Sequence, residues 1–172
     1  EQDEKPGKRQ EPQMNTEPKI PEPAKAASKS LNTNDQHEPL RTKVREFAET
    51  YIKPLANDLD RDNRFPDEIV QKMGQMGLMG IPYPKEYGGQ GLDYNSYAIA
   101  VEELGRVDAG VGVILSAHVS LGCYPIYAYG TEEQKQKYLA PMARGEKIGA
   151  FGLTESEAGS DAGGTETTAE LD

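Results

Sequence analysis

The chain has 172 residues, a formal net charge of -10 and 35% hydrophobic residues, so it can bury one core but is too acidic for a typical nucleic-acid-binding protein. Its single cysteine, Cys123, excludes an intrachain disulfide framework and favours a reducing, intracellular compartment. No apolar run looks long enough to cross a membrane, so we expect no membrane span.

Residues 1–37 predict a disordered polar tail. They are rich in Glu, Lys, Pro and Gln and have few large apolar side chains. Such a segment cannot bury enough surface to offset the entropy lost on ordering. Its mixed charges do not suit a basic nucleic-acid-binding arm, and it lacks the apolar stretch of a signal peptide. The chain starts at Glu1 and stops inside an alternating, strand-like stretch, so we expect it to be a piece of a longer protein.

Residues 38–146 predict a bundle of helices, because their apolar positions recur at steps of three and four. The first helix is expected over about residues 39–60, with a break at Pro54, since an interior proline removes a hydrogen bond and clashes with the preceding turn. A second helix should open at Pro66, with acidic residues in its first turn, and end at Gly77.

Three further helices follow from caps and composition. Asp93 is expected to cap a helix that runs through Leu104. Residues 109–121 are apolar on most faces, which predicts a core helix. Thr131 and Gln134 form a capping box that should open the last helix, and Gly145 should end it.

The polar residues inside this region do not predict a catalytic or metal centre. A lone histidine on an apolar helix, as at His118, is usually a hydrogen-bonded core group, and Cys123 should be a buried, inert thiol. His37 lies at the edge of the tail and should be solvated. Glu102 and Glu103 point apart on a helix, so a solvated or interhelical role is favoured over a carboxylate pair. We expect no metal site.

The pattern changes after Lys147. A short apolar strand, Ile148 to Leu153, leads into a Thr-Glu turn and then a Gly-Ser-Asp stretch with small neighbours. Glycine lets a ligand approach the main chain, and successive turn N–H groups suit phosphate. Residues 147–172 are therefore expected to begin a β-domain. Taken alone, the stretch could also be a strand-to-turn connection whose hydroxyls satisfy local backbone groups.

This stretch, Phe151-Gly152-Leu153-Thr154-Glu155-Ser156-Glu157-Ala158-Gly159-Ser160-Asp161, resembles the flavin-binding segment of the acyl-CoA dehydrogenases. The family pattern is (Phe/Tyr)-x-(Leu/Val)-Thr-Glu-Pro-x-Ala-Gly-Ser-Asp, and the one departure is Ser156 in place of proline. Serine should make the turn looser, at a free-energy cost below about 1 kcal/mol. Further family-like motifs follow one another from about residue 40 onward, among them Glu86-Tyr87-Gly88-Gly89, Glu102-Glu103-Leu104-Gly105-Arg106-Val107-Asp108 and Gly130-Thr131-Glu132-Glu133-Gln134-Lys135. The pattern is most similar to the short-chain, butyryl-CoA type.

The resemblance implies a mainly α fold, an up-and-down helical bundle followed by the first strands of a β-barrel-like middle domain, truncated here. It implies an oxidoreductase acting on CH–CH that uses FAD to oxidise a short-chain acyl-CoA to the 2,3-enoyl-CoA. It also implies an electron-transferring flavoprotein as redox partner and a homotetramer. The catalytic glutamate of the family would lie beyond residue 172, so no catalytic residue is assigned in this chain.

The same resemblance assigns binding residues. It implies that FAD is bound by Phe151, Leu153, Thr154, Gly159 and Ser160, with Thr154 donating to the flavin ring edge and Ser160 bonding the pyrophosphate. Ser160 would also lie near the CoA thioester arm. Leu121, in a Ser-Leu-Gly motif, would line the acyl pocket, although sequence alone leaves a plain core role equally open.

Two alternatives stay open. The chain could be a non-catalytic, truncated helical module that pairs with partner subunits, or it could belong to a related flavin oxidase or monooxygenase on the same fold. The expected location is the bacterial cytoplasm, with the mitochondrial matrix as the alternative.

Overall fold

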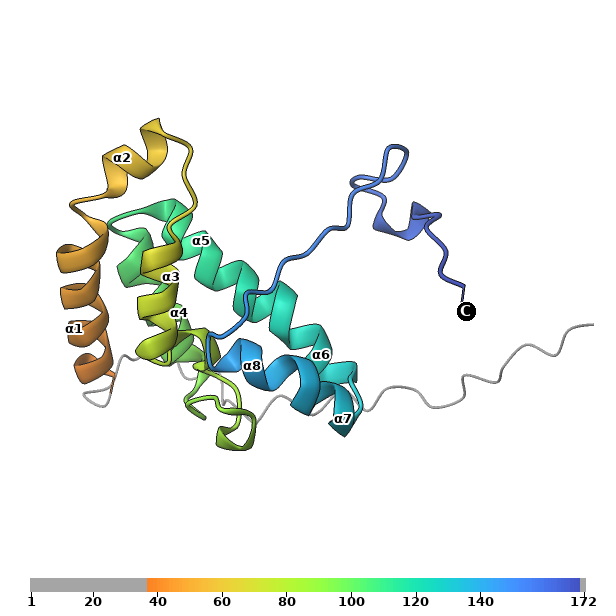
Figure 1. Ribbon diagram of the computed structural model, residues 1–172, viewed down its shortest axis with the longest axis horizontal. Coiled ribbons are helices and arrows are strands. Elements are labelled where there is room, and N and C mark those ends of the chain that lie inside the picture. The colour runs from red at the N-terminus through yellow and green to blue at the C-terminus, as the bar shows by residue number, and fades with distance from the viewer. Residues whose placement is uncertain (1–36, 171–172) are drawn as a thin grey trace, which may run out of the picture.

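The computed structural model describes residues 37–170, which form a helical bundle with a coil leading away from it (Figure 1). The predicted tail, apart from His37, lies outside the described residues. In chain order the elements are α1 (Glu38–Phe47), a π-helical turn (Ala48–Ile52), α2 (Ala56–Arg61), α3 (Asp67–Gln75), 3-10 turns at Leu78–Gly80 and Lys85–Tyr87, α4 (Tyr94–Gly105), α5 (Ala109–Ala117), a π-helical segment (His118–Cys123), α6 (Tyr124–Tyr129), α7 (Glu132–Gln134), a π-helical turn (Lys135–Leu139), α8 (Ala140–Ala143) and a 3-10 turn (Ala162–Gly164).

The predicted helix boundaries are confirmed where they rest on local chemistry. The helix broken at Pro54 divides into α1 with its π turn and α2. Asp93 caps α4 by accepting the Ser96 N–H over 2.8 Å, and the capping box at Thr131 is present. Gly77 and Gly145 follow helix ends with φ of 76° and 75°, a left-handed conformation that favours glycine.

One continuous helix, Ala109–Tyr129, runs through α5, the π-helical segment and α6 and forms the long axis of the bundle (Figure 1). By length and composition it could cross a membrane, so the expectation that no run is long enough is wrong. In the bundle, Val111, Leu115 and Val119 of this helix are buried. These side chains belong to the hydrophobic core, as expected of a core helix, but Val113 is 63% exposed, so the helix is not buried on all of its apolar faces.

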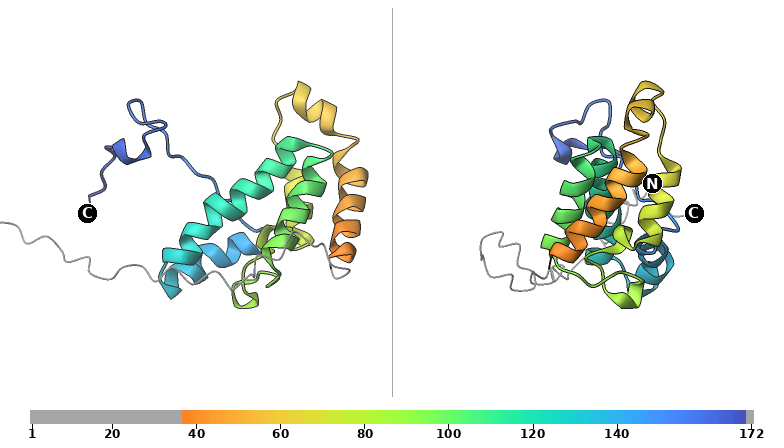
Figure 2. Two further views of the ribbon diagram at one scale, coloured as in Figure 1. Left: turned by 180° about the vertical axis from the view of Figure 1, so that it is seen from behind. Right: turned by 90° about the vertical axis from the view of Figure 1, so that its left-hand side faces the viewer.

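The hydrophobic core lies between this long helix and the helices that pack around it. α4 packs along α5, and α1 packs along α4 on the outside (Figure 2). The largest fully buried apolar side chains in this core are Tyr83, Ile52, Ile69, Met73, Leu78, Met79, Ile81, Leu104, Leu115 and Leu139. Tyr83 is buried with a satisfied hydroxyl, which donates to the Val119 carbonyl over 2.5 Å. The π-helical segment is thereby tied to the loop after α3.

The start of a β-domain is not confirmed. Residues 147–170 form coil with bends and one 3-10 turn, and no β-strand is present among the residues that the structure describes. A strand is defined by hydrogen bonds to a neighbouring strand, and one isolated strand has no partner edge. Strand propensity at Ile148–Leu153 is therefore not sufficient for a strand in this chain.

His37 is not solvated as predicted. Its side chain is 5% exposed, and its Nε2 lies 3.0 Å from Asp93 Oδ2. Asp93 thus accepts both from the start of α4 and from the residue that precedes α1. The prediction was wrong because sequence periodicity does not show that the start of α1 packs onto the start of α4.

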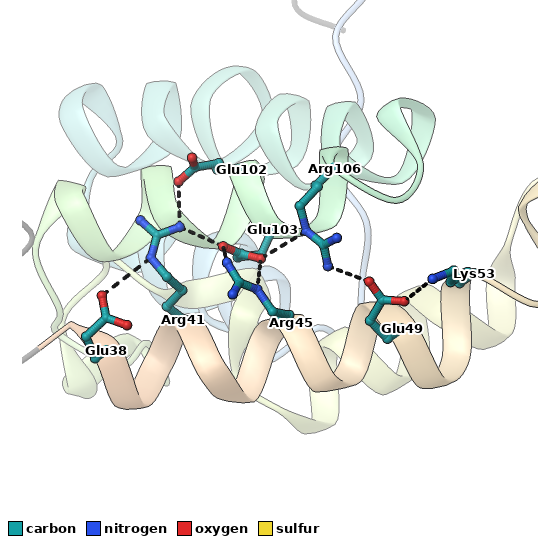
Figure 3. A network of polar contacts seen from close by, with 8 residues as sticks. All are labelled: Glu38, Arg41, Arg45, Glu49, Lys53, Glu102, Glu103 and Arg106. Atoms are coloured by element: carbon teal, nitrogen blue, oxygen red, sulfur yellow. Dashed lines mark hydrogen bonds and ion pairs between the residues drawn. The ribbon is translucent and has the colours of Figure 1, made fainter.

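A buried carboxylate joins α1 to α4 (Figure 3). Glu103 of α4 is 1% exposed and accepts from Arg41 over 2.6 Å and from Arg45 over 2.8 Å, both on α1. Arg106, which follows the last residue of α4, places its Nε 3.4 Å from Glu103 Oε2. The hydrogen bonds from Arg45 outweigh burial, and they lower the pKa of Glu103 to about 2. Of the adjacent acids, the interhelical role is thus confirmed for Glu103, whereas Glu102 is 63% exposed.

We predict that Glu103→Gln lowers the free energy of unfolding by about 3 kcal/mol, because the arginines then face a neutral amide in a buried position. The control Glu102→Gln removes one exposed ion pair and should cost less than about 1 kcal/mol. Chemical denaturation at pH 7 measures both changes. Equal losses in the two variants would contradict the role given to burial.

The same carboxylate sets a pH dependence. Because the pKa of Glu103 is lower in the folded chain than its ordinary value of 4.5, the unfolded chain takes up this proton first as pH falls. The stability that Glu103 provides is complete above pH 4.5 and is lost between there and about pH 2. Glu103→Gln should flatten this part of the profile.

Candidate functional site

The segment from Phe151 to Ser160, predicted to bind the flavin, extends from the bundle as an open stretch (Figure 1). Phe151 is 52% exposed and Leu153 is 43% exposed. Thr154, Gly159 and Ser160 are exposed as well. The structure therefore places all five predicted cofactor residues on one accessible stretch of chain.

This stretch fits a ligand that combines a flat apolar ring with a phosphate group. A Cβ atom added at Gly152 or Gly159 would meet nothing within 4 Å, so the main chain is open to close approach. Exposed apolar side chains of the size of Phe151 and Leu153 are suited to contact with a ring. The hydroxyls of Thr154 and Ser160 can donate to polar edges or to phosphate oxygens.

Glu155 closes the second half of the segment into a loop, which sequence analysis missed. The backbone N–H of Glu155 donates to the Ala158 carbonyl over 2.9 Å. Its carboxylate accepts from the N–H groups of Glu166 and Thr167 over 2.8 and 3.1 Å, and from the Thr167 hydroxyl. These bonds lower the pKa of Glu155, and the Thr167 hydroxyl contributes most. The only sequence signal was an acid in a turn before a Thr-rich stretch.

Leu121, predicted to line the acyl pocket, lies on the π-helical segment and is 45% exposed. The alternative of a plain core residue is therefore wrong. Next to it, Gly122 lies under the chain that leaves the bundle, because a Cβ at Gly122 would come within 2.8 Å of the Gly149 Cα. Leu121 and Phe151 thus both lie close in sequence to this crossing point.

His118 and Cys123 border the same crossing and are both buried at 0% exposure, as predicted. The His118 ring makes hydrogen bonds to Gly149 and Met142, which confirms a hydrogen-bonded core group. Burial raises the pKa of the Cys123 thiol to about 12. A thiol that stays protonated is a poor nucleophile, so Cys123 is not a catalytic candidate.

A cavity of about 490 Å³ lies at the other end of the long helix, between the α2–α3 connection and the start of α5. Its lining includes Leu59, Phe65, Asp108 and Ile114. None of the predicted binding residues contributes to it, so the cavity and the binding segment are separate features.

The helical part of the chain has a known counterpart. Residues 34–146 match the sequence profile of the acyl-CoA dehydrogenase N-terminal domain. The chain belongs to the acyl-CoA dehydrogenase family. It is 58% identical over 142 residues to the short-chain specific acyl-CoA dehydrogenase of Clostridium acetobutylicum, a match that covers 83% of this chain and 38% of that protein.

Solved structures share the fold, and two of them serve as examples. A chain in the structure "Electron transferring flavoprotein of Acidaminococcus fermentans: Towards a mechanism of flavin-based electron bifurcation" matches with a TM-score of 0.79 and 50% identity, over 82% of this chain and 37% of that one. An acyl-CoA dehydrogenase complexed with FAD from Bacillus anthracis matches with a TM-score of 0.74 and 35% identity, over 80% and 24%. The chain thus spans well under half the length of these relatives.

We predict that Glu155→Gln loosens the loop, because a neutral amide oxygen is a weaker acceptor than a carboxylate. Hydrogen–deuterium exchange should speed up at the amides of Glu166 and Thr167. Glu157→Gln, an exposed neighbour, is the matched control and should leave both amides unchanged. Equal exchange in the two variants would contradict the role of Glu155.

Proposed function

We propose that this chain is the N-terminal part of an FAD-dependent, short-chain acyl-CoA dehydrogenase, which oxidises an acyl-CoA of the butyryl class to the 2,3-enoyl-CoA. The observation that carries the proposal is the open Phe151–Ser160 segment, which keeps every position of the family's flavin pattern except Ser156. The short-chain specific relative from Clostridium acetobutylicum supports the choice of substrate class.

The proposal includes an organisation of the chain into three parts. A polar tail over residues 1–37 precedes an α-helical domain over residues 38–146, and residues 147–172 begin a β-domain. The strands that would pair with Ile148–Leu153 and the glutamate that would act as the base are assigned to chain beyond Asp172. This chain therefore contributes one wall of the active site and no catalytic residue.

Each exposed residue of that wall has a distinct role in the proposal. FAD, when bound, supplies the hydride acceptor for the β-carbon of the substrate. Thr154 donates a hydrogen bond to the ring edge and stabilises charge that builds there. Phe151 and Leu153 flank the ring and keep water from it. Ser160 donates to the pyrophosphate and lies near the CoA thioester arm, while Leu121 lines the acyl pocket.

The proposed partners are those of a dehydrogenase. An electron-transferring flavoprotein would reoxidise the enzyme, which is supported by the solved relative from Acidaminococcus fermentans. A homotetramer is proposed for the whole protein. The bacterial relative favours the bacterial cytoplasm as the location, with the mitochondrial matrix as the alternative.

Two other functions fit the same fold. A flavin oxidase or monooxygenase would use the same segment but pass its electrons to oxygen. A non-catalytic module would keep the helical bundle and pair with other subunits without flavin. The open Thr154 and Ser160 hydroxyls favour the flavin-dependent functions over the module, because nothing in a helical pairing module requires them to be accessible.

The deciding experiment is to express the full reading frame and mix the purified protein with butyryl-CoA under argon. A dehydrogenase should be yellow, bleach on mixing and release crotonyl-CoA. In air without an electron acceptor, a dehydrogenase should reoxidise slowly and an oxidase rapidly. A folded, colourless protein that takes up no FAD would overturn the proposal in favour of the module.

We predict that Thr154→Ala slows flavin bleaching by butyryl-CoA about tenfold, the equivalent of one lost hydrogen bond of roughly 1.4 kcal/mol. Thr154→Ser keeps the hydroxyl and should stay near the parent rate. Stopped-flow absorbance under argon measures both. If serine and alanine slow the reaction alike, the hydroxyl is not the group that matters.

A further inference from the structure

The chain leaves the helical bundle at a tight backbone crossing. A Cβ at Gly149 would lie 2.8 Å from the Gly122 Cα and 2.5 Å from the Met142 Cε. Side chains at these two positions would force the backbones apart, so two glycines are needed for the chain that leaves the bundle to touch the long helix. The helix is in its π-helical segment, His118–Cys123, at this point, and such bulges are frequent at functional sites.

His118 holds this crossing with a specific hydrogen bond. Its Nδ1 accepts the Gly149 N–H over 2.9 Å, and its Nε2 lies 3.2 Å from the Met142 carbonyl oxygen and 3.4 Å from the Cys123 Sγ. An accepting nitrogen carries no proton, so the ring is neutral with its proton on Nε2, donating to Met142. The two ring nitrogens thus connect the backbone at Gly149 to the backbone at Met142.

Gly149 is the last anchor before the binding segment. Among the residues that the structure describes, the hydrogen bonds recorded beyond Gly149 stay within residues 155–167. Phe151 follows Gly149 by two residues and Thr154 by five. Because each extended residue spans only about 3.3 Å, a fixed Gly149 restricts where Thr154 can reach.

We propose that His118 is the positioning residue of the flavin-binding segment: its unprotonated Nδ1 holds Gly149 on the long helix and fixes the point from which Phe151–Ser160 project. The proposal rests on the function proposed above. His118 itself is buried at 0% exposure beneath the crossing, so it acts through the backbone of Gly149 and not by touching the cofactor.

A protonated His118 ring could not accept the hydrogen bond from the Gly149 N–H. With a proton on both nitrogens, the ring would present an N–H to the Gly149 N–H, and two donors cannot bond. The groups facing the ring are the Cys123 thiol, the backbone of Met142 and Met79 and the Gly149 amide, and none of them is charged at neutral pH.

The direction of the pH effect follows. Burial lowers the pKa of His118 from its ordinary value of 6.5. A state with the crossing opened and the ring wetted therefore binds the proton more readily than the closed state. Opening should become easier as pH falls below 6.5, and the crossing should be insensitive to pH above it.

Two substitutions separate this role from ordinary core packing. Asparagine places an amide oxygen where Nδ1 lies and can still accept from Gly149. Glutamine reaches the Nε2 position and can still donate to Met142. In the full-length, FAD-loaded protein we expect His118→Gln to raise the Kd for FAD about tenfold, and His118→Asn to remain near the parent value. The parent should bind FAD more weakly as pH falls below 6.5, and His118→Asn should lose this pH dependence.

A readout without cofactor completes the test. In the apoprotein, ¹⁵N NMR of His118 should show the Nε2–H tautomer, and the Gly149 amide should be protected from exchange in the parent and in His118→Asn but not in His118→Gln. Equal loss of FAD and of protection in both variants, or no change in either, would overturn the proposal. If the protein binds no FAD at all, the proposed function fails. Hydrogen exchange of the Gly149 amide alone then decides whether His118 holds Gly149 on the long helix.

Discussion

Packing against the helix Ala109–Tyr129 is the constraint on which the rest of the structure depends. α4 lies along α5 at one end, while the loop after α3 and the π-helical turn before α8 pack along the other. α1 packs mainly along α4, and its Val44 and Phe47 join the hydrophobic core. The same helix carries His118, Leu121 and Gly122, so the core that stabilises the bundle also fixes the base of the candidate site. A change that rotates this helix would disturb stability and site together.

Part of the long helix Ala109–Tyr129 remains exposed. Val113, Leu121 and Tyr129 are exposed apolar residues of this helix, and Phe151 and Leu153 are exposed in the segment that leaves the bundle. A contiguous apolar patch on a protein surface normally marks an interaction site. Accessible apolar side chains are in keeping with the proposed site, which is one wall and not a closed cavity.

Local chemistry made much of this fold predictable, and distance in sequence set the limit. Caps such as Asp93 and Thr131 act within three residues, so their partners could be read from spacing. Glu103 finds Arg41 and His37 finds Asp93 across more than fifty residues, and no periodicity encodes those meetings. The predicted strand at Ile148–Leu153 is not present for a related reason, because a strand requires hydrogen-bonded partner strands that the described residues do not supply. For the site, the motif identified the residues of the open segment. It did not show that the Glu155 carboxylate closes the loop or that His118 bonds the Gly149 N–H.

Two of the buried polar side chains, Glu103 and His118, respond to acid at different points. Glu103 is charged and held by arginines, so its contribution survives until pH falls below 4.5. His118 is neutral and held by backbone groups, so its contribution begins to fall below 6.5. As pH decreases, the crossing at Gly149 should therefore loosen while the α1–α4 contact is still intact. The contact at Gly149 and the α1–α4 contact thus depend on different polar groups, so an intact α1–α4 contact does not by itself guarantee a positioned segment.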